Sequence, residues 1–273
     1  IEEALDEVEE PVEVIIEEPG ENVTEEPEEM PDTWEDGQKI KVRLDDSDRI
    51  LGNSNAQVKM VEYGDWHCED CADFAEDMLP LLKEQYINTG LVSFEFKDYP
   101  MFGEGTYAEH DLAMSAALAA RCAQAEGKFW EMHDIMHEDY DNMEEFYQED
   151  YQGFPVQGEL TEFFGEYAED IGLHEFNFTR CLEYEFYDPE VFEDREEGKA
   201  LGVSRTPTFF INDKKIIGAP FYELFDAAIR DELGLEVEVP EEVEFDGYAF
   251  SDYNDWDVFR PDGKEFFFPN LDD

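Results

Sequence analysis

The sequence predicts an α/β fold made of a strand–helix–strand unit, a block of helices and a closing strand–strand–helix unit. Three observations predict it. Short runs of alternating apolar residues occur on both sides of the middle of the chain, residues 108–197 carry apolar residues at helical spacing, and the first unit has short connections. Strand–helix–strand order with short connections indicates a right-handed crossover and a parallel pair of strands.

The first unit follows from four patterned segments. Residues 38–44 alternate like a short strand, and residues 58–63 form a second strand that ends in a Gly-Asp pair. Residues 66–86 then have apolar positions at helical spacing, namely Phe74, Met78, Leu81 and Leu82. Residues 91–100 return to strand character and are closed by a proline.

The middle block consists of segments that favour helices: 108–127, which is rich in alanine, 128–138, 159–172 and 176–186. Strand character returns at 206–213 and 214–219, which together predict a hairpin around Asn212 and Asp213. Residues 221–234 close the pattern as an amphipathic helix. This layout is typical of a thioredoxin-like sheet that is split by a helical insertion.

These segments divide the chain into five regions. We expect an acidic disordered linker at 1–36, the first part of the thioredoxin-like domain at 37–107, the helical insertion at 108–197, the second part of the domain at 198–235, and an acidic, aromatic extension at 236–273. The linker is either the stalk of a removed membrane anchor or a plain solvated tail. The sequence begins without a secretory signal and has no apolar run of membrane-spanning length, so an excised signal or anchor stays open.

The charge balance indicates a protein built for very high salt. The chain has 75 acidic and 18 basic residues, a net charge of −57, together with 42% apolar residues. In ordinary buffer such a charge favours an expanded chain, whereas in 1 M salt the Debye length is only about 3 Å. Acidic residues also fill the helix-like segments 138–150 and 183–197, which favours a halophilic source over acidic tails. Nucleic acid is disfavoured as a partner, because nothing in the sequence could neutralise phosphates.

Cys68 and Cys71 form a C-x-x-C where the second strand runs into the following helix. The first cysteine of such a pair sits at a helix N-terminus, where unpaired N–H groups and the helix dipole stabilise a thiolate. The second lies one turn further on, close enough to form a disulfide. Half a zinc site has the same spacing, but beside the adjacent His67 the sequence offers no second ligand pair. We therefore predict redox chemistry and no metal.

A second motif is Thr206-Pro207-Thr208, at the start of the first strand of the predicted hairpin. Proline cannot donate to a sheet ladder at that point. Its presence makes sense if the Thr206–Pro207 bond is cis and the loop faces the cysteine pair, where it presents backbone groups to a bound peptide. The alternative is a plain proline at the start of a strand.

Four blocks in this order resemble the DsbA-like family of thiol–disulfide oxidoreductases in the thioredoxin superfamily, including its BdbD-type members. They are DDSDRILGNSNAQVKMVEYGDWHCEDC, FKDYP, AALAARCAQAEGKFWEMHD and GVSRTPTFFINDKKIIGA, and the similarity covers roughly residues 45–233. The resemblance implies a thioredoxin fold with a helical insertion, and oxidation of cysteines in exported proteins outside the cytoplasm. It implies no cofactor.

The same resemblance implies roles for individual residues. Cys68 is the nucleophile that forms the mixed disulfide, Cys71 resolves it, and Pro207 is the cis-proline beside them. Family members are usually reoxidised by a membrane protein of the DsbB or vitamin-K-epoxide-reductase-like type. A tether through a missing N-terminal segment would place this chain near such a partner.

The sequence departs from the family's usual C-P-x-C by carrying Glu69 and Asp70 between the cysteines. Two carboxylates here should raise the pKa of Cys68 relative to a C-P-H-C site. We therefore expect a redox potential between about −120 mV, the value for DsbA, and about −270 mV, the value for thioredoxin. Alternatively, both residues merely continue the acidic surface.

Glu62 lies on the strand that leads to the cysteine pair, six residues before Cys68. A partly buried carboxylate beneath the disulfide would accept the proton of Cys71 during resolution, paired with Lys97 on the next strand. The alternative is a solvated strand residue.

Cys122 and Cys181 fall in two different predicted helices of the insertion, outside any redox motif. In the oxidising compartment that the resemblance implies, we expect a structural disulfide between them, and some family members carry a comparable second pair. The competing interpretation is two independent buried thiols.

The histidines His110, His133 and His137 invite a metal interpretation, since the last two are four residues apart. On an acidic amphipathic helix we expect surface or half-buried histidines and no metal site.

The leading functional hypothesis is an oxidase that donates its disulfide to exported proteins. A disulfide reductase or isomerase is the nearest alternative, favoured by the acidic C-x-x-C. A redox-inactive protein that holds extended peptides at the Pro207 loop is a third.

Overall fold

The structure is a computed structural model that describes residues 44, 46–101, 112–149, 157–219 and 221–236. All of them belong to the compact unit Lys39–Asp273. The predictions made for the linker at 1–36, for the strand at 38–44 except its last residue, for His110 and for the extension beyond Glu236 lie outside the described residues.

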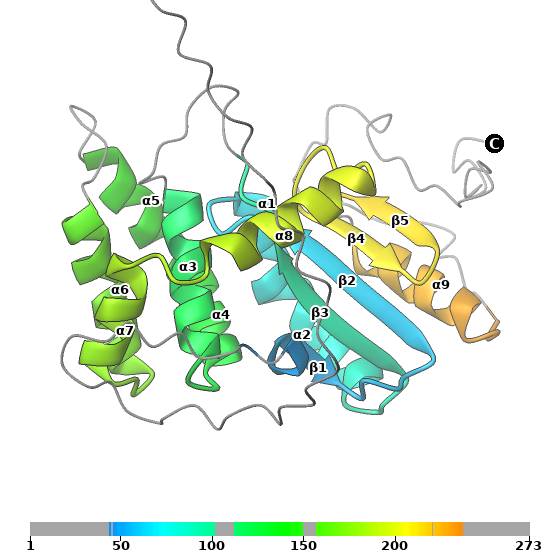
Figure 1. Ribbon diagram of the computed structural model, residues 1–273. Coiled ribbons are helices and arrows are strands. Elements are labelled where there is room, and N and C mark those ends of the chain that lie inside the picture. Colours follow the sequence, from blue (N-terminus) through cyan, green and yellow to red (C-terminus); the bar gives the residue numbers. More distant parts are fainter. Residues whose placement is uncertain (1–43, 45, 102–111, 150–156, 220, 237–273) are drawn as a thin grey trace, which may run out of the picture. The chain divides into compact units, whose positions relative to one another are not determined.

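Within these residues the chain forms a five-stranded sheet of order β1-β3-β2-β4-β5 (Figure 1). Its strands are β1 (Ile50–Gly52), β2 (Val58–Gly64), β3 (Val92–Asp98), β4 (Thr208–Ile211) and β5 (Lys214–Ile217). The predicted parallel pair is confirmed in β2 and β3, and the other neighbours are antiparallel. The predicted hairpin is confirmed in β4 and β5, with Asn212 in its turn at a φ of 51°, which asparagine tolerates better than most residues.

Strand β1 has no counterpart among the sequence predictions. It follows a short 3₁₀ turn, η1 (Asp46–Arg49), and its three residues are too few to form an alternating pattern. It pairs antiparallel with β3 and so forms one edge of the sheet.

The helix predicted at 66–86 is present and has Cys68 as its N-cap residue. It runs through α1 (Glu69–Asp73), a π-helical turn η2 (Phe74–Met78), α2 (Leu79–Leu82) and a second π-helical turn η3 (Lys83–Ile87). Pro80 lies in the first turn of α2, and because proline has no backbone N–H, the regular hydrogen-bond ladder is interrupted there. The cysteine pair therefore lies at the start of this helix, just after the central strand β2 ends.

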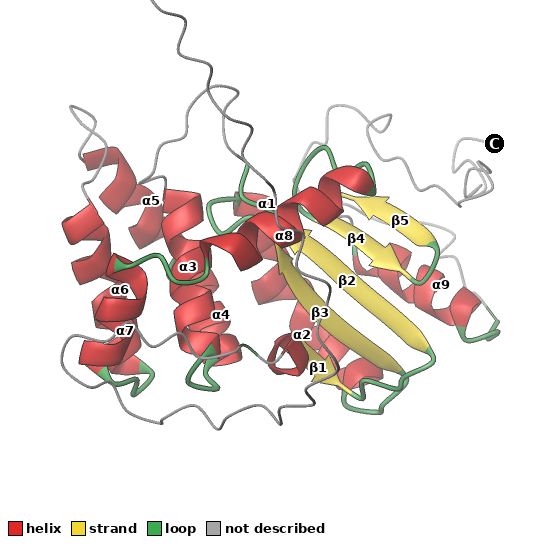
Figure 2. Cartoon of the chain, viewed as in Figure 1, coloured by secondary structure: helices red, strands yellow, loops and turns green. Residues whose placement is uncertain are grey.

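Helices cover both faces of the sheet (Figure 2). On one face, α1, α2 and α9 (Tyr222–Glu232) form an apolar core with the strands, in which Met60, Phe74, Phe94, Phe209 and Phe225 are buried. On the other face, α8 (Asp188–Ala200) packs against Tyr63 and Tyr99. This contact requires Gly198, because a Cβ atom there would lie within 2.8 Å of both tyrosine rings.

The helical insertion consists of α3 (Leu112–Gln124), α4 (Phe129–Glu138), α5 (Tyr140–Glu149), α6 (Gln157–Asp170) and α7 (Glu175–Glu183). Every residue of α3 is buried, since its alanines allow close approach of the neighbouring helices. Helix α8 continues to Ala200, so the region boundary expected at residue 197 falls inside a helix that packs on the sheet.

A disulfide joins Cys122 of α3 to Cys181 of α7, with the two Cα atoms 5.8 Å apart. It spans 59 residues of chain. In the chain-entropy model a loop of this length corresponds to about 4 kcal/mol of stabilisation. The bond therefore fixes the two helices that form the centre of the insertion.

Four buried charged side chains connect the sheet to the insertion: Arg49, Asp98, Arg121 and Asp194. Asp194 of α8 accepts hydrogen bonds from Arg49 at 2.7 Å and from Arg121. Asp98, at the end of β3, accepts one from Arg121 at 2.6 Å and one from the indole of Trp66 at 2.8 Å. Two positive and two negative side chains thus neutralise each other beside Trp66, which lies two positions before Cys68.

Among the residues that the structure describes, no helix combines the length and the apolar character needed to cross a membrane.

Candidate active site

Cys68 and Cys71 lie where strand β2 leads into helix α1. Cys68 has extended backbone angles (φ −124°, ψ 116°), and its carbonyl accepts hydrogen bonds from the N–H groups of Cys71 and Ala72, each at 3.1 Å. Both cysteines are free thiols in this structure; Cys68 is partly exposed and Cys71 is buried. The exposed sulfur is therefore the one at the positive end of the helix, where a thiolate is favoured.

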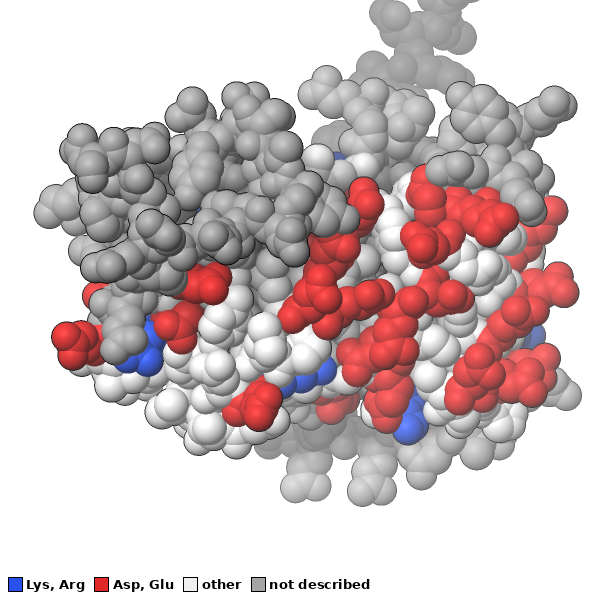
Figure 3. Space-filling model, turned by 180° about the vertical axis from the view of Figure 1, so that it is seen from behind, with Lys and Arg blue, Asp and Glu red and all other residues white. Residues whose placement is uncertain are grey.

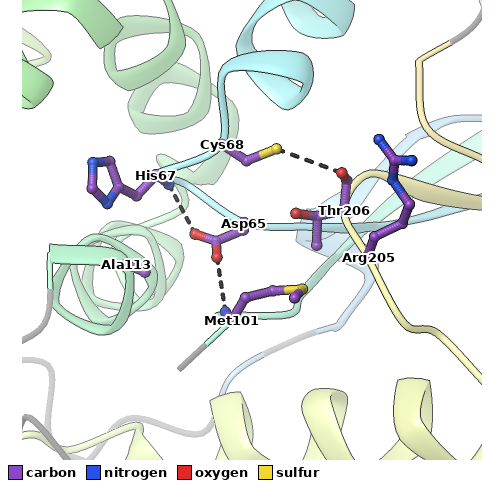
Figure 4. A pocket seen from close by; sticks show the side chains of 7 residues that line it. All are labelled: Asp65, His67, Cys68, Met101, Ala113, Arg205 and Thr206. Atoms are coloured by element: carbon purple, nitrogen blue, oxygen red, sulfur yellow. Dashed lines mark hydrogen bonds between the residues drawn. The ribbon is translucent and has the colours of Figure 1, made fainter. Parts of the chain in front are cut away.

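The Thr206–Pro207 peptide bond is cis, and its loop faces the exposed cysteine. The Sγ of Cys68 donates a hydrogen bond to the carbonyl oxygen of Thr206 at 3.6 Å. Both residues line a pocket of about 460 Å³, together with Asp65, His67, Met101, Ala113 and Arg205 (Figure 4). Figure 4 shows the sulfur pointing to the Thr206 carbonyl, while the imidazole of His67 points the other way. A peptide in this pocket would meet the sulfur of Cys68 between the two loops.

The two thiols differ in acidity. The pKa of Cys68 is lowered from its ordinary value of 9.0, chiefly by a hydrogen bond from the Cys71 thiol and further by one with the Thr206 side chain, against the opposing effect of burial. The pKa of Cys71 is raised well above 9.0, chiefly by burial and further by the hydrogen bond with Cys68. At neutral pH Cys68 is therefore the group that can act as a thiolate nucleophile, and Cys71 holds its proton.

The two carboxylates between the cysteines are not among the main influences on the pKa of Cys68. Glu69 and Asp70 are exposed, where water weakens their effect on the sulfur. The acidic group that raises the pKa of Cys68 is Asp65, which is 5% exposed. Its carboxylate accepts backbone hydrogen bonds from His67 at 2.9 Å and from Met101 at 2.8 Å. Its effect on Cys68 is smaller than that of the hydrogen bonds, so the pKa stays below its ordinary value.

Replacing Asp65 with asparagine should lower the pKa of Cys68 further, because the variant removes a buried negative charge that opposes the thiolate. Thiolate absorbance near 240 nm, followed against pH in molar salt, measures this. The matched control is Asp70→Asn, which removes an exposed carboxylate and should leave the titration almost unchanged. A larger change in Asp70→Asn than in Asp65→Asn would refute this assignment.

Glu62 lies beneath the cysteine pair and is 1% exposed. Its pKa is raised well above 4.5, by burial first and by Cys68 second, and it in turn raises the pKa of Cys71. Gly64 leaves room for it, because a Cβ atom at that position would lie 3.0 Å from the Glu62 carboxyl oxygen and closer still to the ring of Phe96. The alternative of a solvated strand residue is therefore wrong.

The expected pairing of Glu62 with Lys97 is also wrong. In the register of β2 and β3, Lys97 lies opposite Tyr63 and Glu62 lies opposite Phe96. Successive side chains of a strand point to opposite faces of the sheet, so Lys97 projects from the face away from Glu62. There it forms an ion pair with Glu197 of α8.

These features agree with comparisons to known proteins. A family model described as thioredoxin matches residues 45–231. The chain belongs to the thioredoxin family. Among curated relatives, the disulfide bond formation protein D of Bacillus subtilis is 27% identical over 187 residues, which are 67% of this chain and 76% of that protein. The Na(+)/H(+) antiporter NhaA 1 of Salinispora arenicola is 30% identical over 186 residues, 67% of this chain, but the match spans only 24% of the antiporter.

Solved structures show the same fold for this thioredoxin-family protein. Oxidised BdbD from Bacillus subtilis matches with a TM-score of 0.57 at 24% identity, and the match covers 71% of this chain and 98% of that one. The alpha-DsbA1 of Wolbachia pipientis matches with a TM-score of 0.55 at 22% identity, covering 68% and 90%. The curated relatives named as disulfide bond formation proteins and protein-disulfide oxidoreductases identify the chain as a protein-disulfide oxidoreductase, and the solved structures show that it shares the fold of DsbA proteins.

The histidines of this thioredoxin-family protein differ from the prediction. His133 and His137 are not surface residues but are 1% and 2% exposed, and both pack against Trp66. Burial lowers the pKa of each, so they are neutral core residues at neutral pH. No cluster of three or more potential metal ligands occurs among the residues that the structure describes.

Asp65 and Arg205 are two charged pocket residues that were absent from the predicted site. Each lies within three residues of a motif that the sequence does reveal, the C-x-x-C and the Thr-Pro pair. Their proximity to the motifs was the available signal, but sequence alone does not show which neighbouring side chains turn toward the sulfur.

Proposed function

We propose that the protein introduces disulfides into exported proteins through Cys68 and Cys71. A substrate thiolate attacks the Sγ of Cys68 in the oxidised enzyme, the Cys68–Cys71 bond breaks, and Cys71 leaves as a thiolate that takes up a proton. A second substrate thiolate then attacks the substrate sulfur of the mixed disulfide and releases Cys68 as a thiolate. The substrate loses two electrons and two protons, and the enzyme gains two electrons.

The observation that carries this proposal is the position of the Cys68 sulfur, at the start of a helix and within hydrogen-bond reach of the Thr206 carbonyl beside the cis bond. We assign Thr206 and Pro207 the role of presenting backbone groups to the substrate peptide at this sulfur. The lowered pKa of Cys68 supports the oxidative direction, because stabilising the reduced thiolate form makes the disulfide a stronger oxidant.

Two assays in molar salt, run side by side, test the direction. Oxidation of a reduced two-cysteine protein should be fast, and reduction of insulin by the dithiol form should be slow. The opposite ranking would favour the reductase or isomerase alternative. Absence of both activities, with peptide binding retained, would favour the redox-inactive alternative.

We propose further that Glu62 exchanges the proton of Cys71 when that thiol leaves or attacks. Its burial beneath the pair, and the mutual rise of the two pKa values, support this role. Glu62→Gln should slow the two steps that involve Cys71, its departure when the mixed disulfide forms and its attack on the mixed disulfide in the reverse direction, by about 10²-fold, the lower range for general acid–base catalysis. Quenched-flow analysis of the mixed disulfide measures these rates, and unchanged rates would exclude the role.

The same variant should stabilise the protein at neutral pH. The pKa of Glu62 is higher in the folded state than its ordinary value of 4.5, so the folded protein binds this proton more tightly and loses stability as the pH rises above 4.5 toward the folded-state pKa. Each pH unit in that window costs about 1.4 kcal/mol. Urea titrations of wild type and Glu62→Gln at several pH values should therefore diverge as the pH rises, and parallel curves would contradict the raised pKa.

The proposed setting is extracytoplasmic, with a membrane reoxidase of the DsbB or vitamin-K-epoxide-reductase-like type as electron acceptor. The Cys122–Cys181 disulfide supports an oxidising compartment, where such bonds persist. A membrane tether before the first residue is part of this proposal. The described chemistry uses only cysteine sulfurs and protons, so it requires no cofactor.

We also propose that the protein works in molar salt. The face drawn in Figure 3 carries several broad acidic areas and only scattered basic groups, in line with the net charge of −57. Salt screens this self-repulsion. The thermal unfolding midpoint should therefore rise steeply with KCl, and a midpoint independent of KCl would contradict the proposal.

A further inference from the structure

Among the described residues that line the pocket beside Cys68, Arg205 is the arginine, and its side chain is only loosely held. Asp65 accepts two backbone hydrogen bonds, and the imidazole of His67 is bonded to Glu144 of α5. Among the described residues the ion-pair partner of Arg205 is Asp70, at 3.8 Å, with the two side chains 48% and 53% exposed. An ion pair this exposed contributes at most about 1 kcal/mol. The guanidinium can therefore exchange Asp70 for a substrate group at little cost.

The position of Arg205 places it beside the bond that forms. It immediately precedes Thr206, whose carbonyl accepts the hydrogen bond from Cys68, and Figure 4 shows both residues on the side of the pocket to which the sulfur points. Because the Cys68 sulfur points to this side, we expect a substrate sulfur to approach it from here. Neighbouring residues of the substrate follow at about 3.8 Å per Cα step, within the length of an arginine side chain.

We propose that Arg205 is a specificity-determining residue that selects substrate cysteines flanked by carboxylate side chains. The proposal deepens the oxidase function and rests on it. A guanidinium presents its donors as a fork that matches a carboxylate, with two hydrogen bonds at about 2.7–2.9 Å, a better geometry than its contact with Asp70. A substrate glutamate or aspartate next to the reactive cysteine therefore displaces Asp70 from Arg205.

In high salt, the contact between Arg205 and a substrate carboxylate should have more influence on substrate choice than the charge of the rest of the surface. The net charge of −57 would repel acidic substrates at low ionic strength. In 1 M salt, with a Debye length of about 3 Å, charges beyond direct contact are screened. The exposed carboxylates of the surface then have little effect on a bound peptide, whereas a group in contact with Arg205 keeps much of its interaction.

The test uses the oxidised full chain in 1 M KCl and reduced two-cysteine peptides that differ only in the residues flanking one cysteine, which are glutamate, glutamine or lysine. In each turnover the peptide gives two electrons and two protons and becomes a disulfide, and the Cys68–Cys71 disulfide becomes a dithiol. We expect kcat/KM for the glutamate peptide to exceed that for the lysine peptide about fivefold, which corresponds to about 1 kcal/mol. The ratio is taken on one enzyme preparation, so the fraction of folded protein cancels.

Three variants sharpen the result. Arg205→Gln should reduce the ratio to about one, and Arg205→Glu should invert it. Asp70→Asn should enlarge it, because Arg205 then loses its competing partner. The matched control is Arg230→Gln, which removes an arginine that faces Asp226 at 3.9 Å in α9, outside the pocket. The control should keep the wild-type ratio.

Equal rates for all peptides with the wild type, or a preference that persists in Arg205→Gln, would overturn the inference and leave the oxidase function standing. If the wild type oxidises none of the peptides, both the inference and the proposed function fall.

Discussion

The variant Cys71→Ser is expected to be trapped as a stable mixed disulfide with its substrate. The variant Cys68→Ser is expected to lose activity. In Cys71→Ser the exposed Cys68 still forms a disulfide with a substrate cysteine, but no buried thiol remains to resolve it. In Cys68→Ser the remaining thiol is buried and its pKa is raised well above 9.0, so dithiol oxidation should fall by about 10⁴-fold or more.

Non-reducing gel electrophoresis after incubation with a disulfide-containing partner measures the trapped species. The control is Cys122→Ser with Cys181→Ser, which removes the disulfide of the insertion and should trap nothing. A mixed disulfide that forms through Cys71 in the Cys68→Ser variant would contradict the assignment of the nucleophile.

Asp194→Asn is expected to destabilise the fold by about 3–5 kcal/mol, the range for breaking a buried ion pair by removing one partner. Asp194 is the shared acceptor for Arg49 and Arg121, and all three residues are at most 5% exposed. Its loss leaves the buried guanidinium of Arg121 with Asp98, and that of Arg49 with the exposed carboxylate of Asp46. Because Asp98 also holds Trp66, the damage should reach the loop that carries Cys68.

Guanidinium-induced unfolding in molar salt, followed by circular dichroism, measures this change. Glu131→Gln is the matched control, since it breaks an exposed ion pair with Lys128 and should leave the midpoint unchanged. A loss below about 1 kcal/mol in Asp194→Asn would mean that the buried cluster contributes no more than a surface pair.

Much of the fold follows from patterns that sequence carries directly. The parallel pair β2–β3, the hairpin at Asn212 and the helix after Cys68 depend on local periodicity and turn residues, which are visible along the chain. Strand β1 depends instead on pairing with β3, and a segment of three residues has no periodicity of its own. Partner-dependent structure of this kind cannot be predicted from local pattern.

The burial of His133 and His137 was indicated by their spacing in the sequence, but the acidic residues around them pointed to an exposed helix. Phe129, Met132, His133, Met136 and His137 are the buried residues of α4, and their spacing is that of one helix face. The acidic residues between them suggested an exposed helix. The spacing already placed both histidines on the apolar side, with their rings against Trp66.

The site residues that belong to a local motif were predictable from the sequence. The contacts between residues far apart in the chain were not. Cys68 and Cys71 follow from spacing at a strand–helix junction. The pairing of Lys97 with Glu197 depends on the register between two strands and on helix α8, and the contact of Asp70 with Arg205 joins segments far apart in the chain. Neither contact leaves a trace in the local sequence.

Alkylation of the reduced protein with iodoacetamide, followed by mass spectrometric mapping at a series of pH values in molar salt, tests the central claim most directly. The account predicts that the label enters Cys68 almost alone, and that the rate rises with pH through an apparent pKa below 9.0, since the thiolate is the reacting species. Equal labelling of Cys71, or a midpoint at or above 9.0, would contradict a thiolate at Cys68 that is stabilised at the start of the helix.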